Sequence, residues 1–303
     1  MSFIVIYGDN MRFISFFEAG EVRTGVVVAD GAIDIAALEL PGMTSLLDII
    51  RGSTDGLADI ADALARASAA PKPLSTLKLL APVAASGKNI FCIGRNYLGH
   101  VQEGYRARGL PIDVPQAPQI FSKPRTTLAA AGDELRFDRN VSDRMDYEGE
   151  LGIVIGKGGR NIAPKDAFDH IFGYTVINDV TARDLQRKHD QWFKGKGLDQ
   201  SCPMGPWIVT RDEVADIQAV EIVTTVNGET RQSARISQMI FDIPTILAEL
   251  SKGMTLEPGD IIASGTPEGV GYAMATPQYL ADGDVVTVSI SGIGTLTNRI
   301  AMR

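Results

Sequence analysis

The hydrophobic pattern of the first eighty residues predicts short strands followed by helices. Apolar runs at residues 12–17, 24–28 and 32–35 are rich in aromatic and β-branched side chains and predict three β-strands. Asp30-Gly31 between the last two runs predicts a hairpin turn of type I′, in which both central residues take positive φ. The segment therefore begins as a small antiparallel sheet.

Helical periodicity follows the strands. Residues 44–50 and 56–69 predict two helices, and in the second Leu57, Ile60, Ala61 and Leu64 share one stripe. Pro71-Lys72-Pro73 stops this helix. We therefore predict a small N-terminal α+β domain over residues 1–78 and a second domain over residues 79–303.

The second domain is predicted to be rich in strands. Buried strands are indicated at residues 89–94, 151–155 and 172–179, and a hairpin is predicted around Asn227-Gly228. A helix is expected at residues 243–251. These elements predict the α+β class with a predominance of strands.

One long segment of this domain has no periodicity. Residues 104–119 contain three prolines and fit neither a helix nor a strand. Loops of this length in a compact domain are usually functional, and lids are among them.

Composition and charge exclude several classes of protein. The chain has 303 residues, 45% of them hydrophobic and 22% charged, as globular proteins do. A net charge of −8 and a pI near 5.0 argue against nucleic acid or an anionic membrane as the main partner. The N-terminus does not resemble a signal peptide and no run is long enough to span a membrane, so we expect a cytoplasmic protein.

An acidic stretch enters one of the predicted buried strands. Residues 146–155 are Asp-Tyr-Glu-Gly-Glu-Leu-Gly-Ile-Val-Ile, and a strand would place Asp146, Glu148 and Glu150 on one face. Glu148 and Glu150 would lie about 7 Å apart along the strand, close enough to converge on one hard divalent cation. An exposed strand face is the alternative, but acidic side chains beside a buried run are rarely left unpaired.

Asp179 ends the next buried strand and is the third candidate ligand. Its alternative role is to cap the helix that follows. Three carboxylates at the ends of buried strands suit Mg²⁺ or Mn²⁺ with positions left open for substrate, and ligand type alone does not exclude Ca²⁺.

Further polar residues could take part in chemistry. His100 and Glu103 share one face of a helical turn and could form a base oriented by a carboxylate, although such pairs are also common helix salt bridges. Lys196 and Thr266 lie next to glycines, which let a backbone approach a small ligand. A solvated lysine and a plain Gly-Thr-Pro turn are the alternatives.

Taken in chain order, these motifs resemble the fumarylacetoacetate hydrolase superfamily, in particular its bacterial acylpyruvase and oxaloacetate decarboxylase members. The matching motifs cover roughly residues 80–300 and are Gly94-Arg95-Asn96-Tyr97 with His100 and Glu103, Glu148-x-Glu150, Asn178 to Gln186, Lys196, Ser201-Cys202-Pro203, Val226 to Glu229, and Ser264 to Gly271.

The resemblance implies a fold, a metal and a set of site residues. It implies a catalytic domain of mixed β-sandwich roll type, a homodimer, and Mg²⁺ or Mn²⁺ held by Glu148, Glu150 and Asp179. It also implies a lid dyad of His100 and Glu103 that acts in catalysis with Lys196. The substrate contacts that it implies are Arg95, Tyr97, Arg183, Gln186 and Thr266.

The implied reaction is metal-dependent cleavage of a carbon–carbon bond in a small 2-oxo acid or diacid through a pyruvate enolate. Hydrolysis of an acylpyruvate or fumarylpyruvate and decarboxylation of oxaloacetate both fit, because family members with the dyad carry out such cleavages. An isomerase or tautomerase of 2-hydroxy-dienoate or oxaloacetate type is the first alternative. A non-catalytic protein that binds metabolites is the second.

Overall fold

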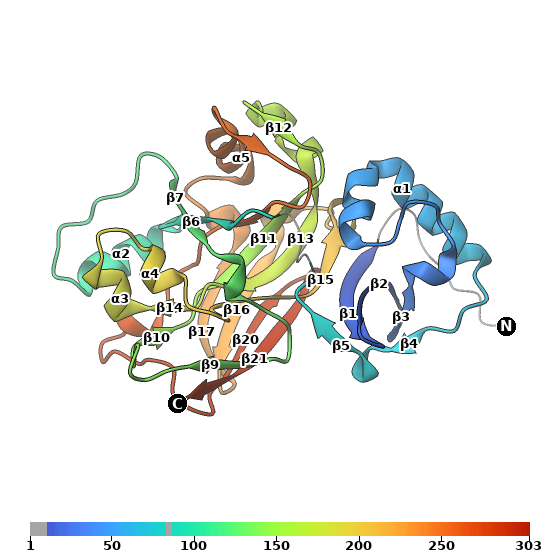
Figure 1. The fold of residues 1–303 in the computed structure, drawn as a ribbon. Coiled ribbons are helices and arrows are strands. Elements are labelled where there is room, and N and C mark those ends of the chain that lie inside the picture. The colour runs from blue at the N-terminus through green and yellow to red at the C-terminus, as the bar shows by residue number, and fades with distance from the viewer. Residues whose placement is uncertain (1–10, 83–86) are drawn as a thin grey trace.

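The computed structural model of the chain describes residues 11–82 and 87–303. Its strands lie in the middle of the molecule, and α1 (Leu46–Arg66) lies on the N-terminal side (Figure 1). Three short helices gather at the opposite end, namely α2 (Leu98–Arg106), α3 (Arg183–Lys188) and α4 (Phe193–Lys196). The fifth α-helix of the described residues is α5 (Ile243–Ser251), as the sequence predicted.

The largest sheet combines strands from both ends of the chain. Its order is β4 (Lys72–Pro73), β3 (Gly31–Asp34), β2 (Glu21–Val28), β1 (Arg12–Glu18), β15 (Cys202–Thr210), β13 (Ile171–Asn178), β11 (Gly149–Ile155), β19 (Ile261–Ala263), β6 (Ile90–Gly94) and β7 (Gln119–Lys123). In addition, β5 (Lys78–Leu80) pairs with β1, and β8 (Leu128–Ala129) pairs with β15.

A second sheet packs across the centre of the first. Its order is β17 (Glu229–Arg235), β16 (Glu221–Val226), β20 (Val285–Ile290), β21 (Gly294–Met302) and β9 (Glu134–Phe137). Leu151, Ile153 and Val176 of the first sheet share one buried cluster with Ile222 and Val288 of the second. Two packed sheets with few helices confirm the β-rich α+β class.

Two small ribbons complete the strands. One pairs β10 (Met145–Asp146) with β14 (Thr181–Ala182), and the other pairs β12 (Gly159–Arg160) with β18 (Thr255–Leu256). The first ribbon lies directly before β11 and directly after β13 in the sequence. It therefore holds together the two chain segments that carry the acidic residues.

The two predicted hairpin turns have different outcomes. Asn227 (φ 53°) and Gly228 (φ 82°) both take positive φ, which confirms the type I′ turn there. The turn predicted at Asp30-Gly31 is wrong by one residue, because Val28 pairs with Gly31 and Ala29 takes the positive φ of 50°. Gly31 lies in β3 instead, where a Cβ would meet the Lys72 carbonyl oxygen at 2.8 Å.

The predicted break between two N-terminal helices is also wrong, because α1 is continuous. Ser45 and Asp48 form a capping box at its start. Ile49, Ile60 and Leu64 are buried on one stripe, so the period of 3.6 continues across the segment that was expected to be a loop. Gly52 within the helix costs about 1 kcal/mol, which burial of this stripe outweighs.

Strand β1 joins the N-terminal region to the rest of the molecule. Arg12 and Phe13 pair with Val209 and Ile208 of β15, and the Phe13 ring lies 5.8 Å from that of Phe172 in β13. The boundary placed between residues 78 and 79 falls inside β5, and the division into two domains stays a prediction. No helix within residues 11–82 and 87–303 is long and apolar enough to cross a membrane.

Candidate active site

Three buried carboxylates meet where β11 begins and β13 ends. The two strands are antiparallel neighbours with Gly149 opposite Asn178, so Glu148 and Glu150 lie beside Asp179. The Asp179 N–H donates to the Glu148 carbonyl (2.8 Å), and the Glu148 N–H donates to Asn178 Oδ1 (3.0 Å). The carboxylate oxygens of Glu148, Glu150 and Asp179 come within 4.8 Å of one another.

Positively charged side chains compensate two of these acids. Lys196 Nζ lies 2.6 Å from both Glu148 Oε2 and Asp179 Oδ2, and Lys123 Nζ lies 2.7 Å from Asp179 Oδ1. The role of helix cap considered for Asp179 is therefore wrong, since its carboxylate binds two lysines and the N-cap of α3 is Ala182. Burial opposes ionisation of Glu148, but Lys196 and Arg183 outweigh it and hold the pKa of this carboxyl well below its usual range.

Glu150 differs from its neighbours because it forms no ion pair with the described residues. Its Oε2 accepts a hydrogen bond from the Gly265 N–H at 2.8 Å. Burial, together with the negative charges of Asp179 and Glu148, raises the pKa of Glu150 well above its usual value. A cation among the three carboxylates would relieve this repulsion.

The group therefore fits a hard divalent cation. It offers carboxylate oxygens from three buried side chains, and one of them has no cationic partner of its own. Such a set suits Mg²⁺ or Mn²⁺. Lys123 and Lys196 already bind two of the ligand residues and would orient their carboxylates.

Asp146 contacts the group of three carboxylates only indirectly, through Arg183. It lies in β10, and the chain leaves the strand between Asp146 and Gly149, so the predicted shared face with the glutamates is interrupted. Its carboxylate accepts hydrogen bonds from Arg183 Nε (2.8 Å) and from the backbone N–H groups of Gly271 and Tyr272. Arg183 then reaches Glu148 Oε1 at 2.6 Å and stacks on Tyr272, 4.4 Å from the ring centre.

His100 and Glu103 form the expected pair on α2. His100 Nδ1 lies 2.9 Å from Glu103 Oε1, and Glu103 Oε2 accepts a hydrogen bond from the Gly269 N–H at 2.8 Å. A carboxylate can only accept, so Nδ1 carries the proton and Nε2 is left as the basic nitrogen. Glu103 thus fixes both the tautomer and the orientation of His100.

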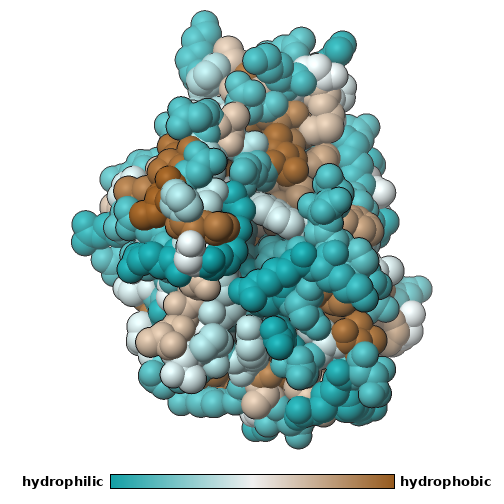
Figure 2. All heavy atoms as spheres, turned by 90° about the vertical axis from the view of Figure 1, so that its left-hand side faces the viewer, coloured by the Kyte–Doolittle hydropathy of each residue, from teal (hydrophilic) through white to brown (hydrophobic). Residues whose placement is uncertain are grey.

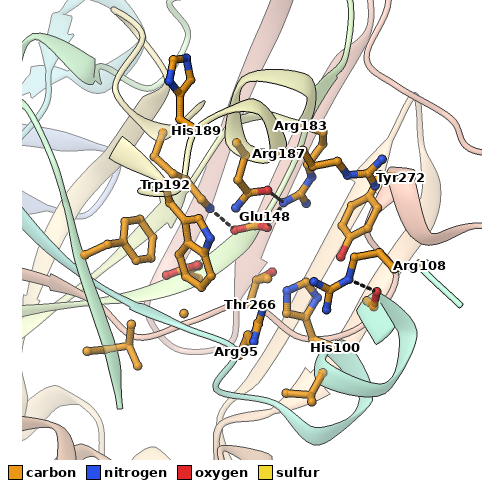
Figure 3. A pocket seen from close by; sticks show the side chains of 18 of the residues that line it. Arg95, His100, Arg108, Glu148, Arg183, Arg187, His189, Trp192, Thr266 and Tyr272 are labelled. Atoms are coloured by element: carbon orange, nitrogen blue, oxygen red, sulfur yellow. Dashed lines mark hydrogen bonds and ion pairs between the residues drawn. The ribbon is translucent and has the colours of Figure 1, made fainter. Parts of the chain in front are cut away.

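His100, Glu148 and Glu150 line one cavity of about 340 Å³. His100 approaches it from α2, while Glu148 and Arg183 lie across from it and Thr266 lies between them (Figure 3). Thr266 Oγ1 accepts a hydrogen bond from Gln232 Nε2 at 2.8 Å, which fixes this hydroxyl group. A base and a potential metal centre therefore face the same enclosed volume.

The structure brings most of the predicted site residues together. The cavity lining includes Arg95, His100, Glu148, Glu150, Arg183, Gln186, Lys196 and Thr266. Glu103 lies behind His100, and Asp179 lies behind Lys196. Tyr97 does not line this cavity. Its side chain is buried, and its hydroxyl group has no hydrogen-bond partner among the described residues.

Sequence reasoning missed several residues of this region. It singled out none of Lys123, Tyr272 and Trp192. For Arg108, in the expected lid, it left open a contact with a distal carboxylate and favoured a solvated charge. Lys123 left one usable signal, because it ends an apolar strand just before Pro124 and a lysine at such a buried position needs an acidic partner. The roles of Tyr272 and Trp192 depend on packing between distant segments.

These features define a β-rich fold with a buried acidic group that could hold a metal ion. Residues 89–301 match the family model described as fumarylacetoacetate (FAA) hydrolase C-terminal. The chain belongs to the fumarylacetoacetate hydrolase family.

Individual relatives cover most of the chain. The oxaloacetate tautomerase YisK of Bacillus subtilis is 49% identical over 227 residues, which are 75% of this chain and 74% of that protein. The structure of a fumarylacetoacetate hydrolase from Exiguobacterium antarcticum has a TM-score of 0.81 and 41% identity, covering 97% of this chain and 100% of its own. A maleylpyruvate hydrolase from Sphingobium sp. SYK-6 has a TM-score of 0.79 and 31% identity over the same shares. The predicted family and fold are confirmed.

Proposed function

We propose that the protein is a divalent-metal-dependent enzyme that interconverts the keto and enol forms of a 2-oxo acid. The observation that carries the proposal is the buried carboxylate group facing the His100–Glu103 dyad across one cavity. The similarity to the tautomerase from Bacillus subtilis supports this reaction.

Glu148, Glu150 and Asp179 would hold the metal ion. When bound, a divalent cation supplies a Lewis acid that favours the enolate form of a 2-oxo acid. Arg183, which is buried and fixed by Asp146, offers a guanidinium group to the substrate carboxylate.

Proton transfer is assigned to the residues of α2. His100 Nε2 takes a proton from the carbon next to the 2-oxo group, and Glu103 stabilises the imidazolium ion that forms. Lys196 donates a hydrogen bond to the 2-oxygen as negative charge develops there. The imidazolium ion then returns its proton to that oxygen, which gives the enol and restores neutral His100, and the reverse sequence gives back the keto form.

Carbon–carbon bond cleavage is the second candidate and uses the same residues. His100 would deprotonate a water molecule for attack on a distal carbonyl of an acylpyruvate, or the enolate would form by loss of carbon dioxide from oxaloacetate. The dyad supports this candidate, as does the structural similarity to the maleylpyruvate hydrolase. This is the reaction that the sequence favoured, and it stays a prediction.

The two candidates differ in one product. Oxaloacetate and acylpyruvates are incubated with the protein and Mg²⁺ or Mn²⁺, and both the loss of enol absorbance and the release of pyruvate are measured. We expect faster keto–enol exchange without pyruvate. Pyruvate formed as fast as the enol is lost would overturn the tautomerase proposal and leave cleavage in its place.

Metal dependence is tested on the same assay. Glu148→Ala should abolish the activity, while Asp143→Ala, an exposed acid close in sequence, should leave it unchanged. Full activity after thorough chelation would contradict a metal-dependent reaction. Failure to turn over any substrate with either metal would favour the non-catalytic alternative.

We retain three further proposals from the sequence, which are a small-molecule partner, a homodimer and a cytoplasmic location. The acidic composition supports a small-molecule partner by exclusion. Nucleic acids and anionic membranes attract basic surfaces, so an acidic protein is a poor partner for them.

A further inference from the structure

We propose that Arg108, assisted by Arg187, binds a second carboxylate at the far end of the substrate, so that this site is specific for 2-oxo dicarboxylic acids. The inference rests on the proposed function and names the substrate class of the same cavity.

The charges along the cavity wall are unbalanced. Arg183 and Lys196 are paired with the buried acids, and His100 is paired with Glu103. Outside these pairs the lining contains the three arginines Arg95, Arg108 and Arg187, and two acidic residues, Glu150 and Asp190. Neither Arg108 nor Arg187 forms an ion pair with the described residues. Cationic groups gathered around a cavity attract an anion, and the carboxylate next to the 2-oxo group, which is assigned to Arg183, accounts for none of these three arginines.

Arg108 is held in a defined position although it follows the end of α2. Its Nε donates to the Gly104 carbonyl oxygen at 2.9 Å, and its guanidinium group stacks on the Tyr105 ring, 4.6 Å from the centre. Figure 3 shows this group on the His100 side of the cavity. Its Nε is bonded, whereas its two terminal nitrogens have no hydrogen-bond partner among the described residues, and such a pair can bind a carboxylate through two parallel hydrogen bonds.

Arg187 approaches the same wall from α3. It packs over the Tyr272 ring at 5.2 Å, next to Arg183 at 4.4 Å. The hydroxyl group of Tyr272 points to Gly104, where a Cβ would come within 2.8 Å of it, and Gly104 also anchors Arg108. Tyr272 thus packs against the buried Arg183 and the exposed Arg187, and its hydroxyl group lies beside the segment that anchors Arg108.

Arg95 does not compete for this role. Its guanidinium group lies between the rings of Tyr105 and Trp192, at 5.4 and 5.5 Å, and it donates to the Tyr105 hydroxyl group. Two aromatic faces already satisfy it.

Arg106 provides a matched control. It is exposed like Arg108, and its Nε donates in the same way to the carbonyl oxygen four residues earlier, that of Gln102, at 3.3 Å. It does not line the cavity. If Arg108 is only a solvated charge of the lid, its substitution should have the same effect as substitution of Arg106. If Arg108 binds substrate, the two effects should differ.

The test compares two substrates that differ only in distal charge, oxaloacetate and its 4-ethyl ester. For Arg108→Gln we expect kcat/KM for oxaloacetate to fall on the order of 10- to 100-fold, mainly through KM, as expected for loss of a charge-assisted hydrogen bond. The ester should be unaffected, and Arg106→Gln should leave both substrates unchanged. Arg108→Gln combined with Arg187→Gln should lower oxaloacetate turnover further.

Equal losses of kcat/KM for oxaloacetate and its ester would overturn the proposal, since they would indicate a structural defect. An unchanged ratio of kcat/KM for oxaloacetate to kcat/KM for the ester would likewise overturn it. If the wild type turns over neither substrate, the proposed function fails. The arginines are then tested by calorimetric titration with oxaloacetate and pyruvate. A preference for oxaloacetate that Arg108→Gln removes supports the carboxylate site, and equal affinities contradict it.

Discussion

Glu103 connects His100 to the chain segment that follows Thr266. One carboxylate oxygen binds His100 Nδ1 and the other accepts from the Gly269 N–H, in a segment 166 residues away. The backbone contact fixes the carboxylate, and the carboxylate fixes the tautomer of the imidazole. A single side chain thereby determines which histidine nitrogen can act as the base.

Glu103→Gln tests this chain of contacts. Glutamine can satisfy Gly269 through its oxygen, but its NH₂ group then faces His100 Nδ1 and favours the tautomer with the proton on Nε2. We expect kcat to fall about 10²- to 10⁴-fold with little change in KM, the range for loss of general-base catalysis. Steady-state kinetics check this, with Gln102→Ala on the same helix as control. An unchanged kcat would remove the dyad from the mechanism.

At the scale of single residues, the sequence pattern predicted the three carboxylates that could bind a metal, but it did not predict which cationic side chains contact them. The spacing of Glu148 and Glu150 and the end position of Asp179 indicated a common site, because neighbouring strand ends meet in space. The cations around them come from β7, α3 and α4, and no local pattern connects these elements to β11. Asp146, which a continuous strand would have placed on the face of the two glutamates, contacts Arg183 instead.

At the scale of elements, α1 shows how a helix end is stabilised. The Asp48 carboxylate accepts hydrogen bonds from the Ser45 hydroxyl group (2.7 Å), the Ser45 N–H (2.9 Å) and the Thr44 hydroxyl group (2.9 Å). The hydrogen bond from the Ser45 side chain is the largest cause that lowers the pKa of Asp48 below its ordinary value of 3.8. These bonds favour the charged form in the folded state.

This predicts a pH dependence for the stability that Asp48 contributes. A lowered pKa in the folded state gives stability that is present above the unfolded value and is lost as the pH falls through the folded value. We expect the wild type to unfold at higher denaturant concentration than Asp48→Asn at neutral pH, and the difference to shrink below pH 3.8. Urea titrations at several pH values measure it. A difference independent of pH would show that the carboxylate charge is irrelevant.

Elements with strong local signals were predicted well and those decided by tertiary contacts were not. Helix α5 matches its prediction because Asp242 and Pro244 mark its start, and Asn227-Gly228 fixes its own turn. The turn after Val28 lies one residue earlier than predicted because β4 packs closely against Gly31. Strand β4 follows Gly31 by about forty residues in the sequence. Helix α1 continued through Gly52 because its buried stripe supplies energy that local propensity does not contain.

At the scale of the whole molecule, the N-terminal strands extend the catalytic sheet. One apolar cluster includes Phe13, Ile33 and Ile60 from the N-terminal region together with Val154 and Ile177 from β11 and β13. These last two strands carry the acidic residues at their ends. Packing of the N-terminal region therefore bears directly on the strands that position the metal site.

The end of the molecule away from the N-terminal strands has a mostly hydrophilic surface. Figure 2 faces the region of α2, α3 and α4 and shows separate apolar patches in a mostly hydrophilic surface. Exposed apolar side chains of these elements and of β7 include Leu98, Ile120 and Phe193. The polar cavity therefore lies at the end of the molecule away from the N-terminal strands, and its rim is mixed.

Because the cluster crosses the predicted domain boundary, the whole chain should unfold as one unit. Phe13→Ala removes a fully buried ring that contacts Phe172 and should destabilise the protein by about 3–5 kcal/mol. Both tryptophans, Trp192 and Trp207, lie in the C-terminal part, so their fluorescence reports on a region remote in sequence from the substitution. We expect the fluorescence and circular dichroism midpoints in urea to shift together. Phe17→Ala on the same strand, where the ring is 43% exposed, should cost about 0.5 kcal/mol or less. A fluorescence midpoint unchanged by Phe13→Ala would instead support two independent domains that meet at residue 78.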